Sequence, residues 1–127
     1  MVDCLGLLLA VVVHPADVQD RDGAKVVLEK ARGLFPSLHL VWADGGYAGA
    51  LIDWVRQTCG CVLQTVLRPV GLKGFVVLPR RSVVERTFGW LHKYRRLSKD
   101  YEYLTSVSET MIVIAMTHLM ARRNVKT

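Results

Sequence analysis

The chain has few of the residues that build disulfide-stapled or membrane-spanning folds. Only three of its 127 residues are cysteine, an odd number without a disulfide-framework spacing. Cys59 and Cys61 have no second Cys/His cluster to complete a zinc site, so we expect semi-buried thiols in a reducing cytoplasm. The apolar run at 5–13 is too short to span a bilayer as a helix, and no Lys or Arg precedes it. We therefore expect a cytoplasmic protein with no membrane partner.

Acidic residues are also in the minority. The chain holds 11 Asp and Glu against 17 Lys and Arg, which gives a net charge of +6 and a pI near 9.6. Thirteen of the 17 basic residues lie from Arg56 onward, so the positive charge belongs to the second half. A concentrated positive charge of this kind favours a polyanionic partner, most often nucleic acid.

Apolar periodicity predicts alternating strands and helices within one domain. We expect a strand at 5–13 that is buried on both faces. We also expect a helix that Asp20 or Asp22 caps and that runs to about Phe35. Further strands are expected at 38–43, which ends at Asp44, and at 61–67, with a short extended segment at 75–78. The remaining helices are expected at 48–58, from Ser82, and from Ser106 or Ser108. This order predicts an α/β fold with a partly parallel sheet.

Two carboxylates, Asp44 and Glu85, are candidates for metal-dependent chemistry. Asp44 closes a predicted strand, where α/β proteins bind ligands, and Glu85 is the one acidic residue in the basic segment 80–96. Such oxygen ligands suit Mg²⁺ beside a phosphate. Each residue also has a purely structural interpretation. Asp before Gly-Gly is common turn chemistry, and Ser82-x-x-Glu85 matches a capping box at a helix start.

The segment around Glu85 also carries the candidate DNA contacts. Arg81 precedes Glu85 by four residues and shares its helical face if the helix extends that far back. Side chains of Arg86, Lys93, Arg95 and Arg96 are expected to reach a nucleic-acid backbone, where contacts give affinity without sequence preference. Phe88 and Trp90, which interleave with them, are expected to belong to the core.

Together these motifs resemble the C-terminal half of the DDE-type transposase domain of bacterial insertion sequences. The resemblance rests on Val2-Asp3-x-Leu5-Gly6 and the apolar run after it, on residues 14–22, on Asp44-Gly45-Gly46-Tyr47 and on residues 81–101. The family has a sequence signature around its glutamate. It reads tyrosine, any two residues, arginine, any three residues, glutamate, any six residues and lysine. Arg81-x-x-x-Glu85 fits this signature, whereas Leu78 replaces its tyrosine and His92, followed by Lys93, replaces its lysine.

The resemblance implies a ribonuclease-H-like fold and two-metal DNA strand cleavage and transfer with Mg²⁺ or Mn²⁺. By motif, Asp44 is similar to the second catalytic carboxylate and Glu85 to the third, while Arg81 and His92 stand where the family contacts DNA. The first carboxylate lies in the family on a strand ahead of the Val2–Gly6 motif, and Asp3 matches a different family residue. We therefore expect residues 1–127 to be the C-terminal portion of the catalytic domain, a partial fold that lacks its first catalytic strand.

Three readings follow for the activity of this chain. In the first, it acts on double-stranded transposon ends only together with its missing part, for example the product of an upstream reading frame. In the second, it is a non-catalytic remnant that binds DNA or inhibits a full-length transposase. In the third, it is a stand-alone nuclease that recruits Asp3 as a further metal ligand.

Overall fold

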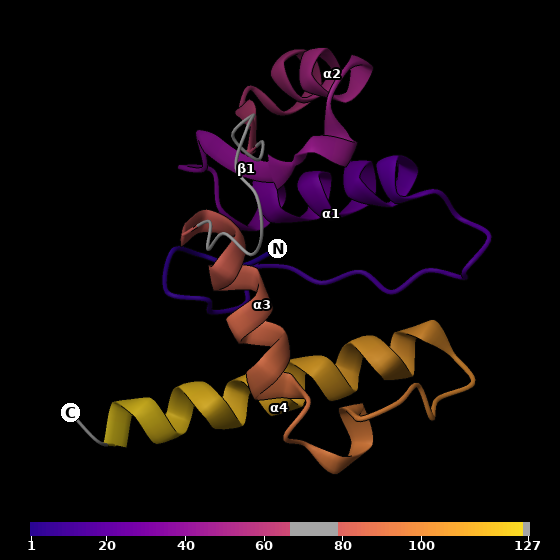
Figure 1. The fold of residues 1–127 in the computed structure, drawn as a ribbon, viewed down its shortest axis with the longest axis vertical. Coiled ribbons are helices and arrows are strands. Elements are labelled where there is room, and N and C mark those ends of the chain that lie inside the picture. Colours follow the sequence, from indigo (N-terminus) through magenta and orange to yellow (C-terminus); the bar gives the residue numbers. More distant parts are fainter. Residues whose placement is uncertain (67–78, 126–127) are drawn as a thin grey trace, which may run out of the picture. The chain divides into compact units, whose positions relative to one another are not determined.

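The computed structural model describes residues 1–66 and 79–125, and these form two compact units (Figure 1). We call Val18–Ser82 the sheet unit. Met1–Asp17 and Val83–Thr127 together form the helical unit. The described residues combine helices with a parallel two-stranded sheet, which confirms the predicted mixture of α and β structure. The extended segment predicted at 75–78 lies outside the described residues.

The sheet unit follows the predicted alternation of helix and strand. Helix α1 packs against α2, and α2 packs against β2. Its elements are α1 (Asp20–Leu34), β1 (Leu40–Asp44), the 3-10 turn η1 (Gly45–Tyr47), α2 (Ala50–Cys59) and β2 (Val62–Val66). The buried side chains of the helices recur at helical spacing, Leu28 and Ala31 on α1 and Leu51 and Val55 on α2. The apolar periodicity of the sequence therefore identified the inward faces of both helices.

Strands β1 and β2 pair in parallel, with Leu40 opposite Val62 and Asp44 opposite Val66. Paired residues of a parallel ladder point to the same side of the sheet, so one face carries Leu40, Trp42 and Val62, which are exposed. Leu63 points to the other face and is buried. The parallel register places Asp44 at the carboxyl end of the sheet.

The start of α1 differs from the predicted capping. Gln19 occupies the N-cap position, and its side chain makes no capping hydrogen bond. Asp20 and Asp22 lie inside the first turn instead. Carboxylates there still stabilise the helix, because they face the positive end of its dipole.

The helical unit is built on two helices that meet in one small core. It contains α3 (Pro79–Leu91) from Val83 onward, the 3-10 turn η2 (Arg95–Leu97) and the long α4 (Thr105–Val125). Leu91 from α3 packs with Ala115 and Met116 from α4, and Leu7 and Leu8 of the N-terminal segment lie against this cluster.

The strand predicted at residues 5–13 is wrong. The chain forms a tight hairpin over residues 1–10, in which Val2 and Leu8 make an isolated antiparallel bridge. Gly6 turns the chain inside the apolar run with a φ of 84°. Its carbonyl accepts a hydrogen bond from the buried Thr87 hydroxyl at 2.6 Å. A run of apolar residues predicts burial, but this contact with α3, 81 positions away in the sequence, decides the backbone path.

Both helices predicted in this half of the chain are present, but each begins earlier than predicted. Helix α3 begins at Pro79, ahead of Ser82, and proline suits a first helical position because its missing N–H would have no partner there. Helix α4 begins at Thr105, ahead of Ser106 and Ser108. Ser82 therefore does not occupy the N-cap position that a capping box with Glu85 requires.

Among the described residues, no helix is both long enough and apolar enough to cross a membrane.

Candidate functional site

Asp44 is the last residue of β1, and its side chain is held by the turn that follows. Its Oδ1 accepts a hydrogen bond from the Gly46 amide at 3.1 Å. A Cβ atom at position 46 would lie 3.2 Å from the same oxygen, so glycine permits this close approach. The carboxylate itself is exposed. The turn interpretation of Asp-Gly-Gly is thus correct, and it leaves the carboxylate in contact with solvent.

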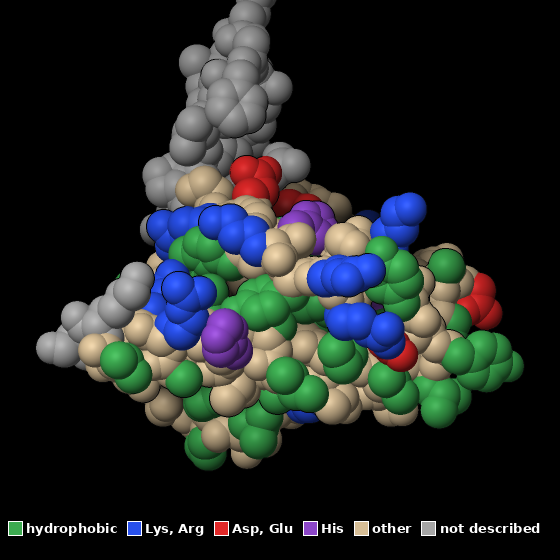
Figure 2. Space-filling model, turned by 90° about the horizontal axis from the view of Figure 1, so that it is seen from below, with side chains coloured by type: hydrophobic (Ala, Val, Ile, Leu, Met, Phe, Trp, Pro, Cys, Tyr) green, Lys and Arg blue, Asp and Glu red, His purple; other side chains and the backbone are tan. Residues whose placement is uncertain are grey.

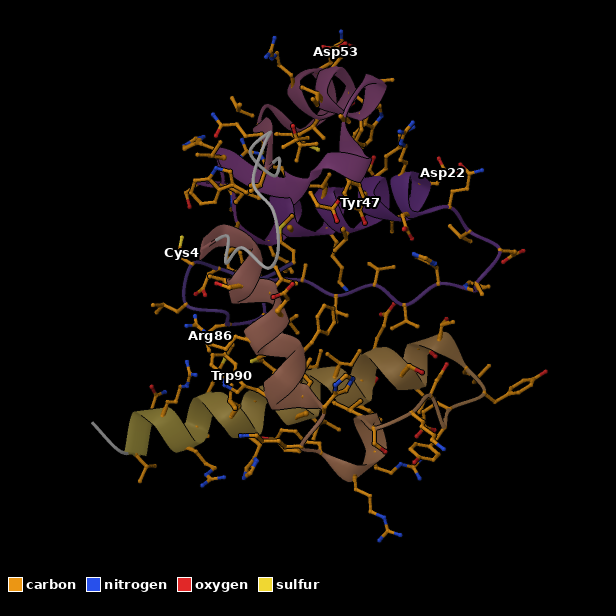
Figure 3. All side chains as sticks on the ribbon, viewed as in Figure 1. Cys4, Asp22, Tyr47, Asp53, Arg86 and Trp90 are labelled. Atoms are coloured by element: carbon orange, nitrogen blue, oxygen red, sulfur yellow. The ribbon has the colours of Figure 1, made fainter. Side chains whose placement is uncertain are left out.

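The start of α1 supports the same turn. The Arg21 guanidinium donates through Nε to the Gly46 carbonyl at 3.3 Å. Burial, followed by the nearby carboxylates of Asp20 and Asp44, raises the pKa of the Tyr47 phenol above its ordinary value. The phenol of Tyr47, which is labelled in Figure 3, therefore stays neutral well above physiological pH, with the carboxylates of Asp20 and Asp44 nearby.

Arg21 and Tyr47 lie within the motifs noted in the sequence but were not predicted as site residues. Tyr47 follows Asp44-Gly45-Gly46 directly, so its closeness to Asp44 could have been inferred from that motif. Arg21 had no such signal, because its contact spans 25 residues.

Glu85 lies on the exposed surface of α3, in the helical unit. Because α3 begins at Pro79, Arg81 and Glu85 both belong to this helix, as their spacing suggested, although the Arg81 side chain lies outside the described part of the structure. Thr87, two residues after Glu85, anchors the N-terminal hairpin through Gly6. The helix that carries Glu85 is thus fixed to the Val2–Gly6 motif.

Asp3 has a structural role in that hairpin. Its Oδ1 accepts hydrogen bonds from the amides of Leu5 at 2.8 Å and Leu7 at 2.9 Å. Such bonds shape a tight turn, in the manner of an Asx-turn. Within the residues that the structure describes, no three His, Cys, Asp or Glu side chains gather closely enough to hold a metal ion.

Arg86, one of the predicted DNA contacts, is engaged inside the helical unit. Its Nη2 donates to the Leu5 carbonyl at 3.3 Å, and its guanidinium lies 5.3 Å from the centre of the Trp90 ring. The Arg123 guanidinium from α4 lies 4.2 Å from the same ring. Figure 3 labels Arg86 and Trp90 beside α3. Trp90 is half-buried, whereas Phe88, which was also expected in the core, is 56% exposed.

The other predicted DNA contacts follow the end of α3. His92, Lys93 and Arg95 are exposed, and α3 has already ended at Leu91, so they do not continue its face. Arg96 is different, since it forms an ion pair with Glu102 and lies over the Tyr101 ring. The face of the helical unit seen in Figure 2 carries lysine and arginine side chains among hydrophobic ones, with few acidic groups. Such a face suits contact with a polyanion.

Comparison with known proteins provides one match. A family profile described as "Transposase DDE domain" matches residues 1–120, which is nearly the whole chain. No curated protein and no solved structure matches the sequence. The matched range includes Asp44 with its Gly-Gly-Tyr turn, Glu85 on α3 and the basic residues that follow it. The chain therefore belongs to the DDE-domain transposase family.

Proposed function

We propose that this chain takes part in DNA strand cleavage and transfer during transposition, with Asp44 and Glu85 as two carboxylates of a two-metal site. Family membership supplies the link to transposition and a DNA substrate. The observation that carries the residue assignment is the position of Asp44, an exposed carboxylate at the carboxyl end of a parallel strand. The proposed fold around it is ribonuclease-H-like.

The donor set fits Mg²⁺ or Mn²⁺. Both ions prefer hard oxygen ligands and leave several coordination positions to water and phosphate, so a few carboxylates suffice. Asp44 and Glu85 would hold the ions. When bound, the metal ions would lower the pKa of water and stabilise the attacking and leaving oxygens of an in-line displacement.

The residues around Asp44 orient its carboxylate, and the neighbouring Tyr47 phenol stays neutral. The Gly46 amide fixes one carboxylate oxygen, and Arg21 fixes the Gly46 carbonyl. Tyr47 is a neutral phenol at physiological pH, and the rise of its pKa widens that margin, so it adds no third negative charge beside Asp20 and Asp44. This arrangement presents the Asp44 carboxylate in one orientation, as a metal ligand requires.

The exposed cations after α3 bind the DNA backbone in this proposal. Lys93 and Arg95 are exposed and lie close to α3, the helix that carries Glu85. Each phosphate that they neutralise releases a counterion, which makes the affinity depend on salt. Arg86 has a different role, because it fixes the N-terminal hairpin through the Leu5 carbonyl.

We further propose that residues 1–127 form only part of the catalytic domain. Two-metal phosphoryl transfer needs another carboxylate to complete the site. Asp3 is engaged with the amides of Leu5 and Leu7, which argues against the reading of a stand-alone nuclease. The missing ligand would come from a full-length transposase or from a polypeptide of an upstream frame, and the purified chain alone would not transfer strands.

Metal binding tests this proposal without relying on activity. Fe²⁺ substituted for Mg²⁺, with peroxide and ascorbate, cuts the backbone of a protein beside a bound ion. We expect cuts near positions 44 and 85 that Asp44→Asn and Glu85→Gln abolish. The matched control is Asp53→Asn, another exposed carboxylate of the sheet unit, which should leave the cuts unchanged (Figure 3).

Two results would contradict the proposal. A cutting pattern that neither Asp44→Asn nor Glu85→Gln alters would remove the metal-site assignment and leave a DNA-binding remnant. Metal-dependent cleavage of transposon-end DNA by purified 1–127 would show that the chain already holds a complete site.

A further inference from the structure

The Trp90 ring carries two arginine side chains that come from different helices of the helical unit. The Arg123 guanidinium of α4 lies 4.2 Å from the ring centre, and the Arg86 guanidinium of α3 lies 5.3 Å from it. Cations are attracted to the electron-rich face of an indole, and both distances are within the range of a cation–π contact. We call Arg86, Trp90 and Arg123 the Trp90 cluster.

The ring itself is held in place by the N-terminal hairpin. A Cβ atom at position 6 would lie 3.1 Å from the Trp90 Cζ3, so Gly6 allows the indole to pack closely on the hairpin. Arg86 is tied to the same hairpin through the Leu5 carbonyl. A fixed ring holds a guanidinium in one orientation before a ligand arrives, which lowers the entropy that binding costs.

The hydrogen-bond donors of Arg123 remain available to a ligand. The side chain is exposed, and its guanidinium contacts the Trp90 ring. No hydrogen bond or ion pair joins this guanidinium to another residue in the described part of the chain. The ring contact therefore orients the guanidinium without occupying its N–H groups.

Acidic residues are missing from the two segments that carry the Trp90 cluster. No Asp or Glu occurs at positions 86–99 or 110–127. Glu85 precedes Trp90 by five positions, whereas Arg86 precedes it by four and so shares its side of the helix. The two guanidiniums lie within about 10 Å of each other, which is the Debye length at about 0.1 M salt, so their charges add for an incoming anion.

We propose that Arg123, held on the Trp90 ring, binds a backbone phosphate of double-stranded DNA. This inference rests on the proposed DNA binding of the chain, and it adds a contact on α4, outside the basic segment 80–96. A guanidinium presents two parallel N–H donors to the oxygens of one phosphate. Trp90 positions Arg123, while Arg86 contributes its charge and remains bound to the hairpin.

The exposure of the Trp90 cluster favours DNA over a free phosphate ion. One ion pair at an exposed site contributes little by itself, because water and salt screen it. On DNA the same contact is one of several, since the exposed Lys93 and Arg95 neutralise further phosphates in the proposed function. The contact at Arg123 therefore adds to an affinity that the neighbouring cations already supply.

Arg122 provides a matched control, because it is exposed and shares the last turn of α4 with Arg123. In fluorescence anisotropy with a labelled duplex, Arg123→Gln should lower the slope of log K against log salt by about 0.9, whereas Arg122→Gln should leave it unchanged. Equal slopes for the two variants would overturn the proposal. An effect of Arg95→Gln without one of Arg123→Gln would overturn this inference alone, and a wild-type chain that does not bind the duplex would overturn DNA binding altogether.

Trp90→Leu tests the role of the ring in positioning Arg123. The variant should lower the salt slope to the value of Arg123→Gln, and the double variant should show no further decrease, because both changes remove the same contact. Trp90→Phe, which keeps an aromatic face, should retain most of the slope. Additive decreases in the double variant would overturn the positioning role.

The emission of Trp90 reports on the contact without any change to the ring, so it decides the case if Trp90→Leu unfolds. In a Trp42→Phe and Trp54→Phe background, Trp90 is the one tryptophan left, and the duplex should change its emission with the dissociation constant that anisotropy gives. Arg123→Gln should remove this change, and Arg122→Gln should retain it. Inorganic phosphate at a matched phosphate concentration should have no effect; an equal change with it would assign the site to a free ion and overturn the proposal.

Discussion

The contact between Gly6 and α3 predicts a large and specific loss of stability for Gly6→Ala. A Cβ atom at position 6 would lie 2.8 Å from the Thr87 Oγ1 and 3.1 Å from the Trp90 ring. The φ of 84° adds left-handed strain of about 1–2 kcal/mol for any residue with a Cβ. Moving the buried Thr87 hydroxyl breaks its hydrogen bond to the Gly6 carbonyl, at about 1–3 kcal/mol. The expected loss is about 2–5 kcal/mol in total.

Substitutions at two other glycines distinguish the cost of backbone strain from the cost of the steric contact. Gly49 has a φ of 93°, but a Cβ there would meet nothing within 4 Å, so Gly49→Ala should cost only the strain, about 1–2 kcal/mol. Gly89, on α3, has neither a positive φ nor a neighbour within that distance. Gly89→Ala should stabilise the helix by about 0.5–1 kcal/mol.

Urea unfolding followed by fluorescence can measure these differences in the helical unit. Trp42 and Trp54 belong to the sheet unit and Trp90 to the helical unit, so a background with the first two replaced by phenylalanine reports on the helical unit alone. Gly49→Ala, which lies in the sheet unit, is measured in parallel by circular dichroism. The reasoning would be refuted if Gly6→Ala cost no more than Gly49→Ala, since the steric contact would then add nothing.

Three further predictions follow from single contacts. Thr87→Val should cost about 1–2 kcal/mol in urea unfolding because it leaves the Gly6 carbonyl without its donor, whereas Thr87→Ser should recover most of the loss; equal effects would contradict this. The raised pKa of Tyr47 means that the folded state keeps the phenol proton to a higher pH than the unfolded state does. The contribution of Tyr47 to the free energy of unfolding is therefore full below the ordinary pKa and is lost as pH rises through the raised one. Tyr47→Phe should therefore flatten the alkaline fall of the free energy of unfolding, and absorbance titration at 295 nm should lose its most alkaline tyrosine; loss of an ordinary tyrosine would disprove the shift. Arg95→Gln should lower the slope of log K against log salt for a DNA duplex by about 0.9 in fluorescence anisotropy, and an unchanged slope would exclude Arg95 from the DNA contact.

The order of elements in the sheet unit was predictable because local sequence determines it. Apolar periodicity gave α1, β1, α2 and β2 to within two or three residues, and their parallel pairing followed from the helix between the strands. Asp44 was placed at a strand end by the same pattern. The assignment to the transposase family likewise rested on motifs that are continuous in sequence, and the family profile confirms it.

The helical unit was less predictable because contacts between distant residues determine it. Residues 5–13 have the composition of a strand, but a hairpin forms because Gly6 turns against Thr87 and Trp90. Ile114 and Ala115 are neighbouring apolar residues of α4, and only the position of the core decides that one is buried and the other exposed.

The sequence by itself thus determined the family, the candidate carboxylates and the local elements, since motif spacing and periodicity are local properties of the chain. The tertiary structure decided which groups hold those elements together, namely Arg21 on the turn after Asp44 and Thr87 on the turn at Gly6. It also decided which apolar face of α4 remains exposed. The physical reason is that burial and hydrogen bonding depend on which residues meet in space, and periodicity identifies an apolar face without identifying what covers it.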